Sequence, residues 1–383
     1  MCCFLVVLLL ALLTGCASNE APAIPEYTAE VVLEPEPHLS ANAEIADFDG
    51  DGLNDVALAI GRHWPGNNLI LFGDGMGGFV RTDTLSNPGD RTYSMSAADM
   101  DGDGDLDLVV SNDRPDVNYV LLNDGSGAFF DRIDFGDPEW PTRNSTVADL
   151  NRDGYPDVVV ANRSSDPRSA ADRPDGPAGG NNYVCLNNAG QPLALDCRAL
   201  PSGSATTITV ADMDNDGFPD LIAPFRDGGQ SHVLFGDGTG AFERYVVFGP
   251  GDAVYRSAMA VDINDDDLLD LVAIGDATRS SWVFRQLPDG TFDAGFRLDD
   301  GDMIPYALDI ADLDGDARND ILVGYRQAPS RLFFNRADSL TGVVVGDSLG
   351  AAYGFGIGDV NHDGELDIAL ARSGASDILF LGN

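Results

Sequence analysis

An aspartate-rich loop recurs seven times along the chain, and this repetition constrains the fold more than any other feature. The copies are ADFDGDGLND (46–55), ADMDGDGDLD (98–107), ADLNRDGYPD (148–157), ADMDNDGFPD (211–220), VDINDDDLLD (261–270), ADLDGDARND (311–320) and GDVNHDGELD (358–367). Successive copies begin 47 to 63 residues apart. A period in this range is typical of repeat architectures, so we expect seven similar structural units.

The spacing within each loop predicts a bound cation. Counting the first aspartate as position 1, side chains that carry oxygen stand at positions 1, 3, 5 and 9, and a glycine usually stands at position 6. A loop with this pattern suits calcium, with the backbone carbonyl of position 7 as a further ligand, whereas zinc prefers nitrogen or sulfur. An EF-hand would need a glutamate at position 12, which is apolar in every copy. We therefore predict up to seven structural Ca²⁺ ions.

The predicted ligands follow from these positions in each loop. They are Asp47, Asp49, Asp51, Leu53 and Asp55; Asp99, Asp101, Asp103, Asp105 and Asp107; Asp149, Asn151, Asp153, Tyr155 and Asp157; Asp212, Asp214, Asp216, Phe218 and Asp220; Asp262, Asn264, Asp266, Leu268 and Asp270; Asp312, Asp314, Asp316, Arg318 and Asp320; and Asp359, Asn361, Asp363, Glu365 and Asp367. Asp267 and Ala317 replace the glycine, so we expect weaker binding in loops five and six. The alternative is a set of turns held by aspartate hydrogen bonds alone.

The segments around the loops predict strands. A run of small residues precedes each loop, a β-rich run such as DVALAI or DLVVSN follows it, and Gly/Asp turns join two further strands. Seven units of four antiparallel strands predict an all-β, seven-bladed β-propeller. The last unit breaks off at DILFLGN (377–383), while YTAEVVLEP (27–35) has no unit of its own. We expect this N-terminal strand to complete the seventh blade and close the ring.

The seven loops and their placement resemble the FG-GAP/VCBS-type repeats of integrin α-chain propellers and many bacterial surface proteins. The resemblance covers residues 27–383. It implies the same propeller fold with calcium in the loops, and it is consistent with adhesion or binding of a partner. Because members of such families differ widely in activity, the resemblance does not identify the ligand.

The N-terminal residues predict that the protein is exported. Residues 1–15 form a short apolar segment typical of a signal peptide. LLTGC (12–16) resembles the lipobox of bacterial lipoproteins, although no Lys or Arg precedes the apolar run. This resemblance implies a lipid on Cys16, a tether over 16–26, and a lipid anchor in the bacterial cell envelope, at the outer membrane or the surface. Alternatively, an ordinary signal is cleaved and the protein is secreted.

Cysteine usage and charge fit this compartment. Cys185 and Cys197 flank the turn NNAGQP, and a pair of cysteines across a hairpin in an exported protein predicts a disulfide.

The net charge is −41, and the chain contains no lysine. This charge argues against nucleic acid and against an anionic membrane surface as partners. We expect membrane contact only through the lipid anchor, and a monomeric propeller.

Arginines and tyrosines predict a ligand-binding rim on the face opposite the loops. Each blade has an arginine five to nine residues after its last predicted ligand: Arg62, Arg114, Arg163, Arg226, Arg279, Arg326 and Arg372. Six residues before the first ligands stand Ala41, Tyr93, Arg143, Thr206, Arg256, Tyr306 and Tyr353. We expect ligand contacts from Tyr93, Arg143, Arg256, Tyr306, Tyr353, Arg62, Arg114 and Arg226, with the insertion at 164–180 overhanging the same face. Alternatively, these arginines pair locally with Asp113, Asp116 and Asp227.

These features favour a calcium-stabilised, surface-anchored binding or adhesion module that recognises a protein or an anionic polysaccharide. The alternative is a polysaccharide lyase, in which an arginine would neutralise a uronate and a tyrosine or histidine would move the proton. The histidines His38, His63, His232 and His362 fall at unrelated positions of the repeat. We therefore expect no catalytic cluster and assign no catalytic residue.

Overall fold

The computed structural model describes residues 25–85, 89–163, 181–188, 192–227, 229–275, 279–299, 303–336 and 339–383. Twenty-eight strands form in these ranges. No segment within them is a helix long and apolar enough to cross a bilayer. The predicted signal segment, Cys16, most of the tether and the insertion at 164–180 lie outside the described residues.

The strands are grouped into seven blades of four antiparallel strands: five blades are separate sheets, and a single pairing of Arg326 with Ala351 joins blades six and seven into one eight-stranded sheet. Blades one to three contain β2 (Ser40–Ala46), β3 (Asp55–Ile60), β4 (Leu69–Gly73) and β5 (Phe79–Thr84); β6 (Thr92–Ala98), β7 (Asp107–Asn112), β8 (Asn118–Asn123) and β9 (Phe129–Phe135); and β10 (Thr142–Ala148), β11 (Asp157–Asn162), β12 (Tyr183–Asn187) and β13 (Leu195–Ala199). Blades four and five contain β14 (Thr209–Ala211), β15 (Asp220–Ala223), β16 (Ser231–Phe235) and β17 (Arg244–Phe248); and β18 (Ser257–Val261), β19 (Asp270–Gly275), β20 (Ser280–Phe284) and β21 (Phe296–Arg297). Blades six and seven contain β22 (Ile304–Ala311), β23 (Asp320–Arg326), β24 (Ser330–Arg336) and β25 (Ser339–Val345); and β26 (Ala351–Gly358), β27 (Asp367–Ser373), β28 (Ile378–Leu381) and β1 (Ala29–Val32).

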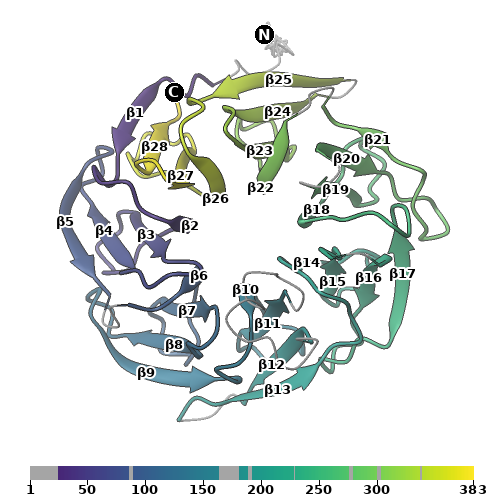
Figure 1. Ribbon diagram of the computed structural model, residues 1–383, viewed down its shortest axis with the longest axis horizontal. Coiled ribbons are helices and arrows are strands. Elements are labelled where there is room, and N and C mark those ends of the chain that lie inside the picture. The colour runs from purple at the N-terminus through teal and green to yellow at the C-terminus, as the bar shows by residue number, and fades with distance from the viewer. Residues whose placement is uncertain are drawn as a thin grey trace, which may run out of the picture.

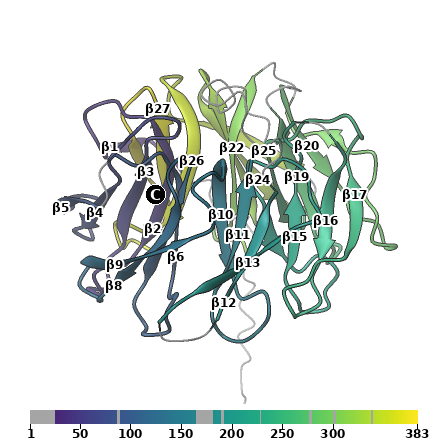
Figure 2. The ribbon, with the colours of Figure 1, turned by 60° about the horizontal axis from the view of Figure 1, so that its bottom comes forward.

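The blades are arranged radially around a central channel (Figure 1). The first strand of each blade lies beside the channel and the fourth lies on the outer edge, and the tilted view shows the blades standing side by side (Figure 2). The predicted seven-bladed β-propeller is therefore the fold of this chain.

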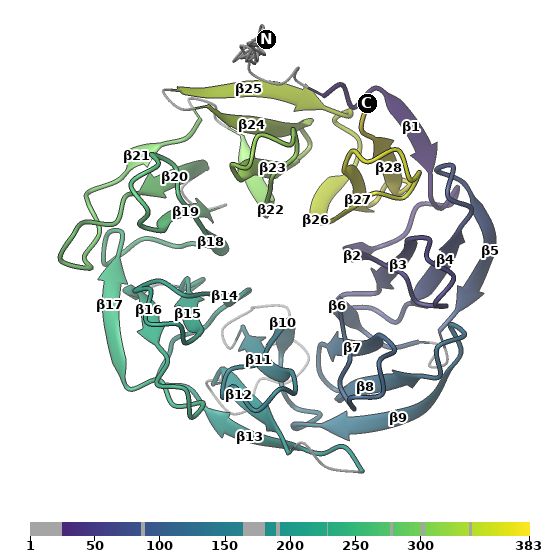
Figure 3. The same ribbon diagram turned by 180° about the vertical axis from the view of Figure 1, so that it is seen from behind.

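The N-terminal strand closes the ring. β1 pairs antiparallel with β28, with Ala29 opposite Leu381 and Val32 opposite Ile378. Both views down the ring show β1 on the outer edge beside β28 (Figures 1 and 3). Blade seven thus combines three strands from one end of the chain with one strand from the other.

The hydrophobic core is divided among the seven interfaces between neighbouring blades. The second strands are buried along their whole length, as in β3, β7, β11 and β19. A strand buried on both faces is expected to be a continuous apolar run, which matches sequences such as DVALAI. The interface between blades seven and one contains Leu33, Ala43 and Leu379, so the seam is packed like the others.

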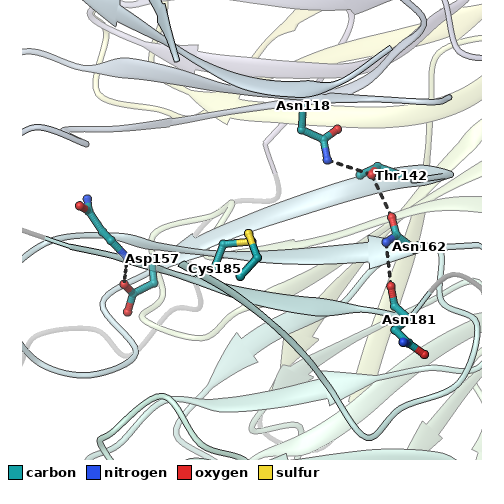
Figure 4. The surroundings of a disulfide bond; sticks show 8 residues. Asn118, Thr142, Asp157, Asn162, Asn181 and Cys185 are labelled. Carbon is teal, nitrogen blue, oxygen red and sulfur yellow. Dashed lines mark hydrogen bonds between the residues drawn. A yellow bond between two sulfur atoms is a disulfide. The ribbon is translucent and has the colours of Figure 1, made fainter. Parts of the chain in front are cut away.

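Buried polar side chains also link neighbouring blades. Asn118 donates to the Thr142 hydroxyl (3.0 Å), which donates to Asn162 (2.9 Å), and Asn162 donates to the carbonyl of Asn181 (2.7 Å) (Figure 4). Each of these bonds satisfies a polar group that would otherwise be costly to bury. In the same blade the disulfide joins Cys185 to Cys197 across β12 and β13.

Candidate functional site

Each aspartate-rich loop connects the first strand of a blade to the second, and its first aspartate organises the turn. In loop one, the Asp47 carboxylate accepts the N–H groups of Gly50 (2.8 Å) and Gly52 (2.9 Å). Positions 4 and 6 have a positive φ in every loop. Position 6 is Asp267 in loop five (φ 64°) and Ala317 in loop six (φ 67°). The backbone strain expected from these two replacements is therefore present.

The aspartate at position 9 opens the second strand of each blade and is buried in all seven blades. The two carboxylate oxygens of Asp55 accept the N–H groups of Phe48 (2.9 Å) and Gly73 (2.9 Å). The same pair of bonds, to position 2 of the loop and to the end of the third strand, recurs in the other six blades. Burial raises the pKa of Asp55 to about 6, although both N–H groups oppose the rise. This aspartate fastens the loop to the blade, and each oxygen keeps a further lone pair for a metal.

The carboxylates of four loops are placed to share a cation. In loops one, two and four, oxygens from positions 1, 3 and 9 lie within 4.8 Å of one another, as do those from positions 1, 3 and 5 in loop six. In the other three loops position 3 is Asn151, Asn264 or Asn361, and an amide oxygen also suits calcium. Within the described residues, Oδ1 of Asp49 is buried without a hydrogen-bond partner. A cation in loop one would satisfy this oxygen, so the donor set fits calcium.

Loop six differs because an arginine reaches into it. Arg336 on β24 pairs with Asp314 (2.5 Å) and Asp316 (3.2 Å), two of the predicted ligands. The guanidinium already neutralises these carboxylates, and the strained Ala317 adds to the cost of the loop conformation. Both features disfavour calcium in loop six.

At the other end of the first strands, one residue from each blade faces the central channel. These residues stand six positions before the first aspartate of each loop, and together they line one cavity of about 320 Å³. They are Ala41, Tyr93, Arg143, Thr206, Arg256, Tyr306 and Tyr353. A strand rises about 3.3 Å per residue, which puts the end of the cavity that these seven residues form roughly 20 Å from the loops. The structure therefore brings together the channel-facing half of the predicted rim.

A β-bulge accounts for this orientation in five blades. The pairing of the first strand with the second skips one residue in each of these blades, namely Ala41, Tyr93, Arg143, Tyr306 and Tyr353. A bulge interrupts the alternation of side chains and re-aims the extra residue. All five skipped residues line the cavity.

The rim arginines fall into two groups. Arg143 pairs with Asp113 (2.8 Å), Arg163 with Asp227 (2.9 Å) and Arg372 with Asp347 (2.8 Å). These three arginines thus make the local pairs that were the alternative expectation, and of the three only Arg143 was expected to contact a ligand. Arg114 and Arg226, both in the described part of the chain, do not line the cavity.

Arg62 and Arg256 form the second group. They are 5% and 9% exposed, and within the described ranges neither pairs with a carboxylate. The Arg256 guanidinium lies over Tyr306 (4.2 Å to the ring centroid) and Tyr353 (5.1 Å), and its Nε donates to the Tyr306 carbonyl (2.7 Å). Arg62 lies over the same Tyr353 ring (3.9 Å) and contacts the Ser373 hydroxyl. Two buried cations thus flank one tyrosine at the channel mouth.

The cavity-lining Tyr93 belongs to a histidine cluster that sequence reasoning missed. His63 Nδ1 lies 2.7 Å from Asp113 Oδ2, and its Nε2 lies 2.7 Å from the Tyr93 hydroxyl. Burial by itself would raise the pKa of Asp113, but Arg143 and His63 together hold it below its ordinary value. The expectation that the histidines assemble no cluster is therefore wrong for His63. The sequence did contain one signal for this cluster. His63 directly follows the rim arginine Arg62, and Asp113 directly precedes the rim arginine Arg114.

Below the mouth, two acids lie beside the channel. Burial raises the pKa of Glu44 to about 7, with a further contribution from the nearby Asp309. Burial likewise raises the pKa of Asp309 to about 6. Both acids therefore hold a proton up to a higher pH than an exposed carboxyl group does.

Comparisons with known proteins agree with this architecture. A family model described as FG-GAP-like repeat matches residues 47–110, 99–160 and 212–273. A search of curated proteins finds no match. Among solved structures, BBS1N in complex with ARL6DN is similar, with 14% identity and a TM-score of 0.57 over 94% of this chain and 96% of that one.

A lectin from Agrocybe aegerita, solved for its recognition of non-reducing terminal N-acetylglucosamine, is also similar. It has 15% identity and a TM-score of 0.55 over 81% of each chain. Likeness at these identities concerns the fold, whereas the family model matches the loops themselves. The chain is thus a β-propeller that carries FG-GAP-like repeats.

Proposed function

We propose that the protein is a calcium-supported module that binds an acidic glycan at the channel mouth. The observation that carries this proposal is the pair Arg62 and Arg256, both buried and without a carboxylate partner among the described residues. Buried charges are normally paired, and two cations against one ring repel each other unless an anion compensates them. Arginine's planar fork suits carboxylate and sulfate groups.

The shape and lining of the site favour a sugar over a protein surface. The cavity is concave, and its volume of about 320 Å³ lies in the range of small-molecule sites. Hydroxyl and amide side chains, including Asn42, Ser94, Thr146 and Thr209, continue below the mouth. These groups can exchange hydrogen bonds with sugar hydroxyls, while the tyrosine rings supply apolar faces.

A neighbouring groove extends the site. It is lined by Arg62, Arg326 and Ser348 and shares Tyr306 and Tyr353 with the channel cavity. A ligand of more than one sugar unit can therefore run from the channel mouth onto the surface of blades six and seven. This continuity supports an oligosaccharide rather than a single monosaccharide as the ligand.

In this proposal calcium acts at a distance from the ligand. The loops that fit the ion lie on the far face, so calcium would stabilise the blades and leave the arginine pair to recognise the glycan. The proposal includes anchoring through Cys16 at the bacterial surface, which rests on the lipobox, and a role in adhesion, which rests on the resemblance to FG-GAP/VCBS-type repeat proteins.

Calorimetric titration with acidic and neutral oligosaccharides tests the proposal. The double variant Arg62→Gln/Arg256→Gln should lose at least about 30-fold in affinity for the acidic ligands, because truncating a buried charge contact costs about 2–5 kcal/mol. Arg198→Gln is the matched control, since Arg198 is exposed and pairs with Asp196 on the outer strand β13. Equal affinity of the double variant and the control for every acidic ligand would refute the proposal.

A further inference from the structure

The channel mouth holds an arrangement that binding alone does not require. Asp113, His63 and Tyr93 form a line of hydrogen bonds that ends at a cavity-lining phenol. We infer that Tyr93 is the proton-transferring residue of an elimination that cleaves a uronate-containing polysaccharide. This inference rests on the proposed acidic-glycan site and adds catalysis to it.

The line of hydrogen bonds defines which atom acts as the base. The Arg143 guanidinium lies 2.8 Å from Asp113, so the carboxylate is ionised and accepts the Nδ1–H of His63. In the tautomer that this bond selects, the Nε2 lone pair of His63 accepts the hydroxyl proton of Tyr93, 2.7 Å away. With its proton directed at His63, the Tyr93 oxygen has only lone pairs left for a further partner. This is the arrangement of a base, oriented by a histidine that is itself oriented by a carboxylate.

The cations of the mouth match the charge that the reaction develops. Removing the proton α to a uronate carboxylate places extra negative charge on that carboxylate. Arg256 lines the same cavity as Tyr93, without a carboxylate partner in the described part of the chain. The Arg143 guanidinium lies over the Tyr93 ring (4.5 Å to the centroid), so a second cation stands beside the phenol. Preorganised charges of this kind stabilise the transition state more than the ground state.

The step balances without a co-reactant. His63 takes the Tyr93 hydroxyl proton, and the phenolate removes the α-proton of the uronate. The electron pair of that C–H bond forms the new carbon–carbon double bond as the β C–O glycosidic bond breaks. Tyr93 then gives the same proton to the departing oxygen, and His63 returns its proton to Tyr93. The products are a chain with a new hydroxyl and a chain that ends in an unsaturated uronate.

The test uses the full chain with calcium and oligosaccharides of polygalacturonate, alginate and hyaluronan. Ultraviolet absorbance of the unsaturated product follows cleavage, and calorimetry follows binding. Tyr93→Phe should lower kcat at least about 100-fold, the scale of general acid–base catalysis, with unchanged affinity. His63→Gln should lower kcat without changing KM, because His63 acts through Tyr93. Tyr245→Phe, which alters an exposed tyrosine stacked on His232, should remain fully active.

Each outcome decides a separate question. Product formed by the wild type and by Tyr245→Phe, but not by Tyr93→Phe that still binds, supports the inference. Product formed equally by Tyr93→Phe overturns the role of Tyr93. Binding of an oligosaccharide without any product overturns catalysis and leaves the binding proposal standing. Absence of both binding and product overturns the two together.

Discussion

Replacing Asp377 with asparagine should stabilise the ring at neutral pH. Asp377 is 1% exposed at the interface between blades seven and one, where its carboxylate accepts the Arg372 N–H (2.6 Å) and the Ser40 hydroxyl (2.7 Å). At the corresponding place in blades one and two, Asn68 and Asn118 each accept a backbone N–H and donate to a threonine hydroxyl. An asparagine at position 377 can reproduce that pattern without a charge.

The magnitude follows from the pKa of Asp377. Burial raises this pKa from its ordinary value of 3.8 to about 6, although hydrogen bonds from Arg372 and Ser40 oppose the rise. The folded state therefore holds the proton more tightly than the unfolded chain. The stability contributed by this proton is fully present below about pH 4 and is lost as the pH rises through about 6. A rise of this size corresponds to about 3 kcal/mol.

Urea unfolding of the wild type and Asp377→Asn at a series of pH values measures this effect. The variant should gain up to about 3 kcal/mol at pH values well above 6, and the difference should vanish towards about pH 4. The control Asp196→Asn, at an exposed carboxylate, should show no such pH dependence. A variant that is less stable than the wild type at every pH would refute the reasoning, because the carboxylate would then act only as an acceptor.

Further perturbations address calcium, the seam and the disulfide. EDTA should lower the melting temperature sharply, because each site with a Kd of about 0.1–1 mM adds about 1.4 kcal/mol of stability when calcium is in tenfold excess over Kd. An unchanged melting temperature would exclude structural calcium. Ala317→Gly should raise stability by about 1–2 kcal/mol, because it removes the strain of an alanine in the left-handed backbone region. A lower melting temperature of this variant would contradict the expectation. Deleting 27–35 should destabilise the ring far more than deleting 17–24, and equal melts would disprove closure by β1. Reducing the Cys185–Cys197 bond should cost up to about 3 kcal/mol, measured by urea unfolding with and without reductant.

The fold was predictable because the repeat fixes it. Seven loops in register, each followed by a continuous apolar strand, predict seven blades, and the unit that breaks off at 377–383 together with the unassigned strand at 27–35 predicts closure of the ring. Local spacing also places the loop carboxylates, because positions 1, 3, 5 and 9 belong to one short segment. Nothing in that spacing reveals the double backbone hydrogen bond of Asp55, which depends on where the third strand ends.

The ligand site was predictable only in part, because it depends on contacts between blades. Tyr93 and His63 come from different blades, and their hydrogen bond requires the relative placement of two repeats. Arg143 pairs with a carboxylate, whereas Arg256 has no carboxylate partner among the described residues, and this contrast also depends on the tertiary neighbours of each side chain. The β-bulges that aim five rim residues into the channel leave no mark in the alternation of a single strand.

The pairing of β1 with β28 also sets the order in which the ring can form during synthesis. Ala29 emerges from the ribosome about 350 residues before its partner Leu381, which is on the order of tens of seconds at 5–20 residues per second. During that interval β1 is a strand without a neighbour, and such edges invite pairing with other chains. Its four residues, AEVV, include the charged Glu30, and a short charged edge resists such pairing. β1 is thus synthesised long before its partner strand, and it presents little surface for pairing with other chains.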